Sequence, residues 1–128
     1  MDDAGSVEKE LISLTQRLLD AIAGRKWATY DALTDPSITC FEPEAPHQLV
    51  EGPAFHRFYL SQQPPKTVPT TTVVRPHVRI CGDTAVVAYV RLIQSLTDDG
   101  RSSVESFAET RIWSRASGTW KQVHFHRS

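Results

Sequence analysis

The first quarter of the chain has the apolar spacing of an amphipathic helix. Apolar residues recur there at steps of three and four, at Val7, Leu11, Leu14, Leu18 and Ile22. This spacing gathers them on one face of a helix. Ser6 is a candidate N-cap in front of the run, and Gly24 is a candidate terminator behind it. The pattern predicts one long helix whose apolar stripe needs a surface to pack against.

The middle of the chain predicts shorter elements separated by prolines. Four are expected in chain order: a helix over 27–33, a short strand over 38–41, a brief extended stretch over 47–50, and a helix that begins at Pro53 and carries His56. Pro36 should end the first of these helices. Residues 62–69 contain three prolines and are expected to form a loop, because proline supplies no backbone donor for a ladder.

From Thr70 onward the pattern becomes that of β-strands. Turn signals separate four expected strands, at 70–81, 85–96, 104–114 and 120–126. Three helices followed by a four-stranded antiparallel meander predict an α+β fold, in which a curved sheet wraps the long helix as a cone. The mouth of such a cone is a common place for a pocket. Edge strands and an exposed sheet face would leave surface for self-association.

Composition narrows the classes of function. A chain of 128 residues is expected to form one domain, over residues 1–128. A net charge of -1 gives no global field toward nucleic acid or an anionic membrane. The N-terminus lacks the pattern of a signal peptide, and no apolar run approaches membrane-spanning length. Cys40 and Cys81 match no zinc or redox spacing, so we expect two buried, reduced thiols and a cytoplasmic protein.

Each of the last three expected strands carries an arginine among apolar residues. Strand alternation puts Arg91, Arg111 and Arg127 on the same side as their apolar neighbours. Three guanidinium groups in a partly dry cavity would repel each other, and a bound carboxylate or phosphate would relieve that cost. The alternative is structural, with each arginine paired to a carboxylate such as Glu105 or Glu109, or placed at a strand end in solvent. Spacing alone leaves both open.

Signatures of other chemistry are weak. His124 and His126 form an H-x-H pair, but no third ligand stands at a characteristic spacing, so no metal is expected. The chain has no glycine-rich phosphate loop, kinase signature or nucleophile elbow, and no cofactor is expected. Small cones of this kind do host acid–base enzymes, for which the candidate side chains here are Tyr30, Asp31, His56 and Tyr89. An arginine-rich cavity would keep a carboxylate ionised and paired, which makes it a poor base.

Several strings in the chain resemble the association domain of Ca²⁺/calmodulin-dependent protein kinase II. In chain order they are Phe41-Glu42-Pro43-Glu44-Ala45, Leu49-Val50-Glu51-Gly52, Phe55-His56-Arg57-Phe58-Tyr59, Glu109-Thr110-Arg111-Ile112-Trp113 and His124-Phe125-His126-Arg127-Ser128. The leading helix and Ala88-Tyr89-Val90-Arg91 add to the likeness. The resemblance runs from Glu8 to Ser128, and the order of the strings makes it specific.

This resemblance implies a cone-shaped fold similar to nuclear transport factor 2. It also implies a non-catalytic hub that assembles with itself into a closed ring of stacked dimers and holds kinase domains at high local concentration. The kinase domain or its linker would be a partner in cis. The family's arginine-lined pocket implies a ligand-binding role for Arg91, Arg111 and Arg127, with His56 at the rim. Its ligand would be a small carboxylate or an acidic stretch of the protein's own linker.

One segment departs from the family. Animal members usually carry an aromatic residue near the pocket, in the loop that here reads Ser61-Gln62-Gln63-Pro64-Pro65-Lys66. The resemblance therefore does not extend to a ligand that depends on closure of that loop, and the chain is expected to be a distant or non-animal homologue. The hub hypothesis predicts a particle many times the 14.4 kDa chain mass. The alternative, a free-standing small-molecule enzyme or binding protein of the same cone fold, predicts a monomer or dimer. Replacing Arg111 by Ala should abolish carboxylate binding.

Overall fold

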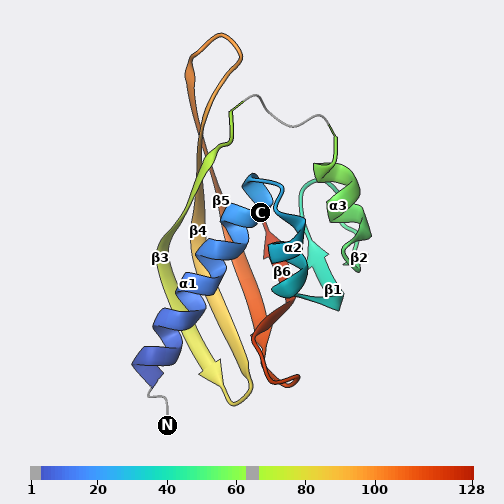
Figure 1. Cartoon of the computed structure of the whole chain (residues 1–128), viewed down its shortest axis with the longest axis vertical. Coiled ribbons are helices and arrows are strands. Elements are labelled where there is room, and N and C mark those ends of the chain that lie inside the picture. The colour runs from blue at the N-terminus through green and yellow to red at the C-terminus, as the bar shows by residue number, and fades with distance from the viewer. Residues whose placement is uncertain (1–3, 63–66) are drawn as a thin grey trace.

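The computed structural model describes residues 4–62 and 67–128 (Figure 1). Its elements are, in order, α1 (Ala4–Ala23), α2 (Trp27–Ala32), β1 (Thr34–Phe41), β2 (Val50–Glu51), α3 (Ala54–Leu60), β3 (Thr70–Cys81), β4 (Thr84–Leu96), β5 (Ser102–Ser114) and β6 (Lys121–Arg127). The strands form one sheet in the order β2-β1-β6-β5-β4-β3. The predicted α+β architecture of a long helix against a curved sheet is confirmed.

The sheet is larger than the predicted meander. β3, β4, β5 and β6 pair antiparallel in sequence order, as expected. β1 then adds beside β6 in parallel, and the two-residue β2 pairs antiparallel with β1. A strand that precedes the meander by some 30 residues in the chain gives no local signal of which edge it will join, because its partner is set by tertiary contacts. Pro36 was expected only as a helix stop, but it lies within β1, where the register with β6 is irregular between Thr34 and Thr39.

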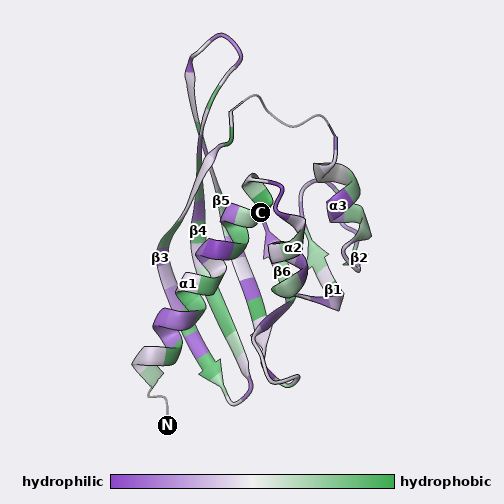
Figure 2. Ribbon diagram, viewed as in Figure 1, coloured by the Kyte–Doolittle hydropathy of each residue, from purple (hydrophilic) through white to green (hydrophobic). Residues whose placement is uncertain are grey.

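The core lies between α1 and the inner face of the sheet. Leu11, Leu18 and Leu19 of α1 are fully buried, as are Val87 of β4 and Trp113 of β5. Burying each such leucine contributes about 1.5–3 kcal/mol. Hydrophobic and polar residues lie on different faces of α1, as the spacing in the sequence predicted (Figure 2). The helix differs at its start, because α1 already includes Ala4, so Ser6 lies inside the helix and is not its N-cap.

The side chain of Gln16 forms hydrogen bonds between α1 and the edge strand β3. Its side-chain amide donates to the carbonyl of Thr71 at 2.8 Å and accepts from the amide of Val73 at 2.9 Å. These are the bonds that a neighbouring strand would make, so the Gln16 side chain covers part of the open β3 edge. The sequence pattern did not single out this residue.

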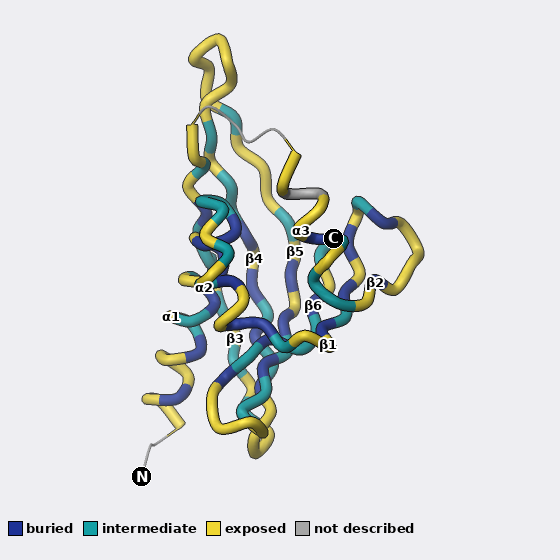
Figure 3. Tube along the Cα trace, turned by 45° about the vertical axis from the view of Figure 1, so that its right-hand side comes forward, coloured by how far each residue is buried: buried dark blue, intermediate teal, exposed yellow. Residues whose placement is uncertain are grey.

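The opposite face of the sheet is left without a helix among the described residues. Several outward-facing positions of β3, β4 and β5 are apolar and half-buried or exposed, namely Val74, Val86, Ala88, Val90, Leu92 and Ile112. Polar residues lie among them on the same face, including Arg79, Ser106 and Thr110. The register sets Val90 between Val74 on β3 and Ala108 on β5. Figure 3 shows how buried and exposed positions alternate along these strands, and how the β4–β5 hairpin projects as an exposed arm beyond the body. An apolar sheet face of this kind is typical of an interaction surface.

The predicted loop over 62–69 falls partly outside the described residues, which resume at Thr67 without regular structure before β3. Within the described residues, no helix is long and apolar enough to span a membrane.

Candidate functional site

Three neighbouring strands bring the predicted arginines together around one carboxylate. Glu109 of β5 stands opposite Tyr89 of β4 and opposite Arg127 of β6 in the sheet register. Glu109 Oε2 is 3.1 Å from Arg91 Nη1, and Oε1 is 3.0 Å from Arg111 Nη2. Arg127 Nε lies further away, 3.9 Å from Glu109 Oε2. The three arginines therefore lie around one carboxylate, and each has a carboxylate partner within the chain, as the structural alternative expected.

Glu109 is held as a carboxylate. Its side chain is fully buried, yet the charges of Arg111 and Arg91 and a hydrogen bond donated by the Tyr89 hydroxyl offset the burial and lower its pKa to about 2. Burial raises the pKa of Tyr89 to about 12, so its hydroxyl keeps its proton and donates it to Glu109. A fixed, fully paired carboxylate and a protonated phenol are poor general bases.

Arg111 is the most buried of the three arginines, with 1% of its surface exposed. Its Nη1 donates to the side-chain carbonyl of Gln122, whose amide donates in turn to Thr34 Oγ1 at 2.8 Å. Its guanidinium carbon lies 4.4 Å from the centre of the Phe125 ring. Arg111 therefore ties β5 to β6 and β1, and a change at this residue affects the fold as well as any ligand.

Arg127 has a second set of partners on the segment between β1 and β2. Its Nη2 donates to Glu44 Oε1 and lies 3.6 Å from Glu42 Oε2. Its guanidinium carbon stacks 4.7 Å from the centre of the Phe107 ring. Burial, followed by the charge of Glu44, raises the pKa of Glu42. Two buried polar atoms of the cluster, Arg91 Nε and Glu44 Oε2, have no hydrogen-bond partner among the described residues.

His56 of α3 lies beside the cluster in a buried position. Its Nδ1 shares a 3.0 Å hydrogen bond with the Tyr30 hydroxyl, and its ring centre is 5.7 Å from that of Phe125. Burial and the nearby arginine charges, that of Arg111 first, lower the pKa of His56 to about 3. The imidazole is therefore neutral at physiological pH and serves as a hydrogen-bonding group.

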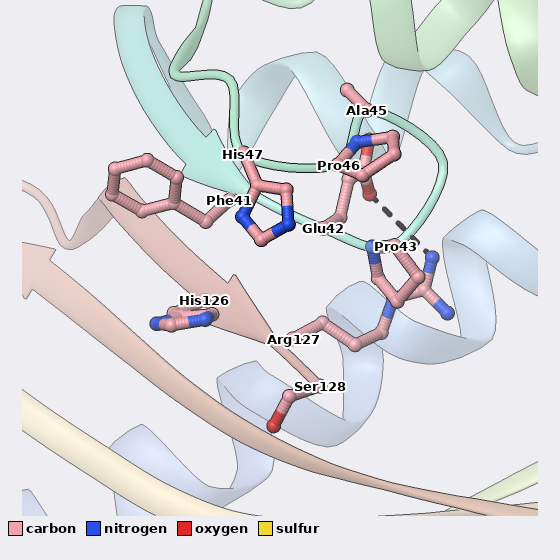
Figure 4. A pocket seen from close by; sticks show the side chains of 9 residues that line it. All are labelled: Phe41, Glu42, Pro43, Ala45, Pro46, His47, His126, Arg127 and Ser128. Atoms are coloured by element: carbon pink, nitrogen blue, oxygen red, sulfur yellow. Dashed lines mark ion pairs between the residues drawn. The ribbon is translucent and has the colours of Figure 1, made fainter.

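A cavity of about 530 Å³ opens between the β1–β2 segment and the end of β6 (Figure 4). Its walls carry Phe41, His47 and Pro46 on one side, and His126, Arg127 and Ser128 on the other. Arg127 is thus the one of the three arginines that lines this cavity. Together with Glu42, it gives the cavity charged groups on otherwise apolar walls.

Other predicted candidates are placed elsewhere. Asp31 is exposed and pairs with Arg57 on α3. Of the two cysteines expected to be buried, Cys40 is buried and Cys81 is exposed. His124 Nδ1 is 2.7 Å from Thr39 Oγ1, and the described residues contain no group of His, Cys, Asp or Glu that could hold a metal. Sequence reasoning named Glu109 as a pairing partner but missed Glu42 and Glu44. Their position in the Phe41–Ala45 string was the available signal.

Comparison with known proteins identifies the family. Residues 7–128 match the family model described as the calcium/calmodulin dependent protein kinase II association domain. The chain belongs to this family. It is 44% identical to calcium/calmodulin-dependent protein kinase type II of Caenorhabditis briggsae over 128 residues, covering 99% of this chain and 24% of that protein. It is 40% identical to the delta subunit of calcium/calmodulin-dependent protein kinase type II of Oryctolagus cuniculus, again covering 99% of this chain and 24% of that protein.

Solved association domains share the structure. The association domain of the C. elegans kinase superposes with a TM-score of 0.90 at 44% identity, covering 97% of this chain and 96% of that one. The hub homology domain of Chlamydomonas reinhardtii superposes with a TM-score of 0.89 at 42% identity, covering 96% of this chain and 98% of that one. A nuclear transport factor 2-like protein of Salmonella enterica superposes with a TM-score of 0.80, covering 98% of this chain and 92% of that one. It is only 19% identical, so the likeness shows the fold alone. The predicted family and fold are confirmed.

As an association domain, the chain is a non-catalytic hub with a role in oligomerisation. It spans about a quarter of the length of the two kinases compared above.

Proposed function

We propose that this chain assembles into a closed ring of stacked dimers and thereby gathers the kinase domains of its parent protein. The uncovered apolar face of the sheet, on a chain 44% identical to an association domain, is the observation that carries this proposal. Tethering kinase domains to one ring would raise their local concentration, so that one domain meets its neighbour without a bimolecular search. The kinase domain itself lies outside the residues that this chain matches.

The dimer contact is proposed to use the face opposite α1. Val90 is 39% exposed and lies between Val74 and Ala108 on the neighbouring strands. The partly exposed pair Val86 and Ile112 continues the apolar surface along β4 and β5. A stable interface buries about 800 Å² per partner, which an uncovered face of four long strands can supply. Burial of such a face against a second copy would also explain why valine and isoleucine stand where a solvated antiparallel sheet carries polar residues.

Substitution of Val90 tests this contact. Val90→Asp places a charge at the centre of the proposed interface and should reduce the solution mass measured by size exclusion with light scattering, while circular dichroism stays native. Leu49→Asp is the matched control, because Leu49 is half exposed in the segment before β2 and lies off this face. An assembly of unchanged mass in Val90→Asp would refute the proposed interface.

We also propose that the arginine cluster, with His56 beside it, binds a small carboxylate or an acidic segment of the parent protein's linker. The support is the convergence of three guanidinium groups, an unpartnered Arg91 Nε, and a cavity that reaches Arg127. Because Arg111 also holds the sheet together, Arg111→Ala is a poor test of binding. Arg127→Gln should abolish the heat of succinate binding in titration calorimetry. Arg17→Gln, at an exposed position of α1, should leave it unchanged.

A further inference from the structure

The charges of the cluster balance within the chain. Arg91 and Arg111 share Glu109, at 3.1 and 3.0 Å. Arg127 is 3.9 Å from that carboxylate and instead donates to Glu44, with Glu42 at 3.6 Å. Three guanidinium charges thus face three carboxylates. An incoming carboxylate finds no arginine without a partner, and it can bind strongly only by replacing one of these internal carboxylates.

Glu44 is held less completely than Glu109. Glu109 receives hydrogen bonds on both oxygens, whereas Glu44 is bonded through Oε1, and its Oε2 is buried without a partner. A buried acceptor without a donor costs about 1–3 kcal/mol. Rotation of the Glu44 side chain into water would remove that free-energy cost. Rotation of Glu109 would remove no such cost, because both of its oxygens already accept hydrogen bonds.

The segment that carries Glu44 is held by short turns. The amide of Ala45 bonds to the carbonyl of Glu42 at 3.1 Å, and that of Gln48 bonds to the carbonyl of Ala45 at 3.2 Å. His47 adopts a left-handed backbone conformation, with φ of 61°, which is unfavourable for a residue with a side chain. The segment lies outside the strands and can change without breaking the ladder between β1 and β6.

The cavity of about 530 Å³ lies between this segment and the end of β6, with Arg127 in its wall (Figure 4). A small carboxylate that enters there meets Arg127 and Glu42, which both line the cavity, whereas Glu44 bonds Arg127 Nη2 without being one of the lining residues. Arg127 is also stacked on Phe107, so its position does not depend on Glu44 alone.

We propose that Glu44 is an internal competitor for the carboxylate site, which an external carboxylate occupies by exchanging with Glu44 on Arg127. This inference rests on the carboxylate site proposed above. Glu44 thereby sets the affinity of the site: it keeps Arg127 paired when no ligand is present and selects against weak anions. Glu42, more deeply buried and further from Arg127, remains in place and limits how many negative charges the site accepts.

The test is calorimetric titration of the assembled protein with succinate. Glu44→Gln keeps the size of the side chain and removes its charge, and it should bind succinate about tenfold more tightly, as expected for loss of one competing charge-assisted hydrogen bond. Glu8→Gln makes the same change of net charge at an exposed position of α1 and should bind as the unmodified protein does. The double variant Glu44→Gln/Arg127→Gln should show no heat of succinate binding, as Arg127→Gln alone does, because the gain in Glu44→Gln requires the guanidinium of Arg127.

The outcomes separate the two proposals. Tighter binding in Glu44→Gln alone supports the competitor. Binding to the unmodified protein with no gain, or a loss, in Glu44→Gln would overturn the competitor and leave the carboxylate site standing. No binding of succinate to either the unmodified protein or Glu44→Gln would overturn both.

Discussion

Replacing Glu109 by glutamine should destabilise the fold more than any change on the surface of the sheet. The substitution keeps the shape of the side chain but removes the negative charge that faces Arg91 and Arg111. Both guanidinium groups would remain buried, at 8% and 1% exposure, without their common counter-ion. Removing one partner of a buried ion pair costs about 3–5 kcal/mol.

The expected change in melting temperature follows from the chain length. An unfolding entropy of about 2.1 cal/mol/K per residue converts this loss into a fall of roughly 10–20 °C for a domain of this size. Differential scanning calorimetry of Glu109→Gln measures it. Glu105→Gln, an exposed residue on the same strand, is the matched control and should shift the melting temperature by about 2 °C or less. Because assembly also stabilises a fold, both variants are compared at equal concentration and equal solution mass.

Addition of an anion distinguishes a loss of stability caused by uncompensated positive charge from one caused by a packing defect. If uncompensated positive charge causes the loss, succinate should raise the melting temperature of Glu109→Gln more than that of the unmodified protein. A fall of less than 3 °C in Glu109→Gln would refute the account of Glu109 as the central counter-ion. A large fall with no anion rescue would place the loss in packing.

Two further predictions concern the loss of stability at low pH and the contact between Gln16 and the edge strand β3. The pKa of His56 is lowered to about 3 and that of Glu109 to about 2, so the unfolded chain takes up their protons first. Stability in urea should therefore fall as the pH drops from 6.5 toward 3 through His56, and from 4.5 toward 2 through Glu109, and His56→Gln should lose the upper part of this slope. Gln16→Ala should cost about 1–3 kcal/mol and speed hydrogen exchange at Val73, and Ser13→Ala on the exposed side of α1 should do neither.

Local patterns predicted most of the elements. The strand expected over 70–81 is β3 itself, and the next three strands lie within two residues of their expected ends. Alternation of period two is a local property, and turn residues such as Gly82 and Gly118 adopt the left-handed conformation that such turns need. The pairing of β1 with β6 was not predicted, because it joins segments about 85 residues apart and depends on the whole sheet.

The site was predicted in part for the same reason. Alternation placed Arg91, Arg111 and Arg127 on one face, and Glu109 was among their expected partners. Glu44 approaches Arg127 from an irregular segment whose direction no periodicity describes. The burial of His56 against Tyr30 likewise depends on how α2 and α3 meet, which the sequence pattern does not encode.

The most direct test of the hub is its mass in solution. Native mass spectrometry of the chain over a dilution series should give one closed species of a dozen or more chains of 14.4 kDa, as closed symmetry of this kind allows. That species should persist on dilution, because a large apolar interface dissociates slowly. A monomer or a simple dimer at every concentration would contradict the account.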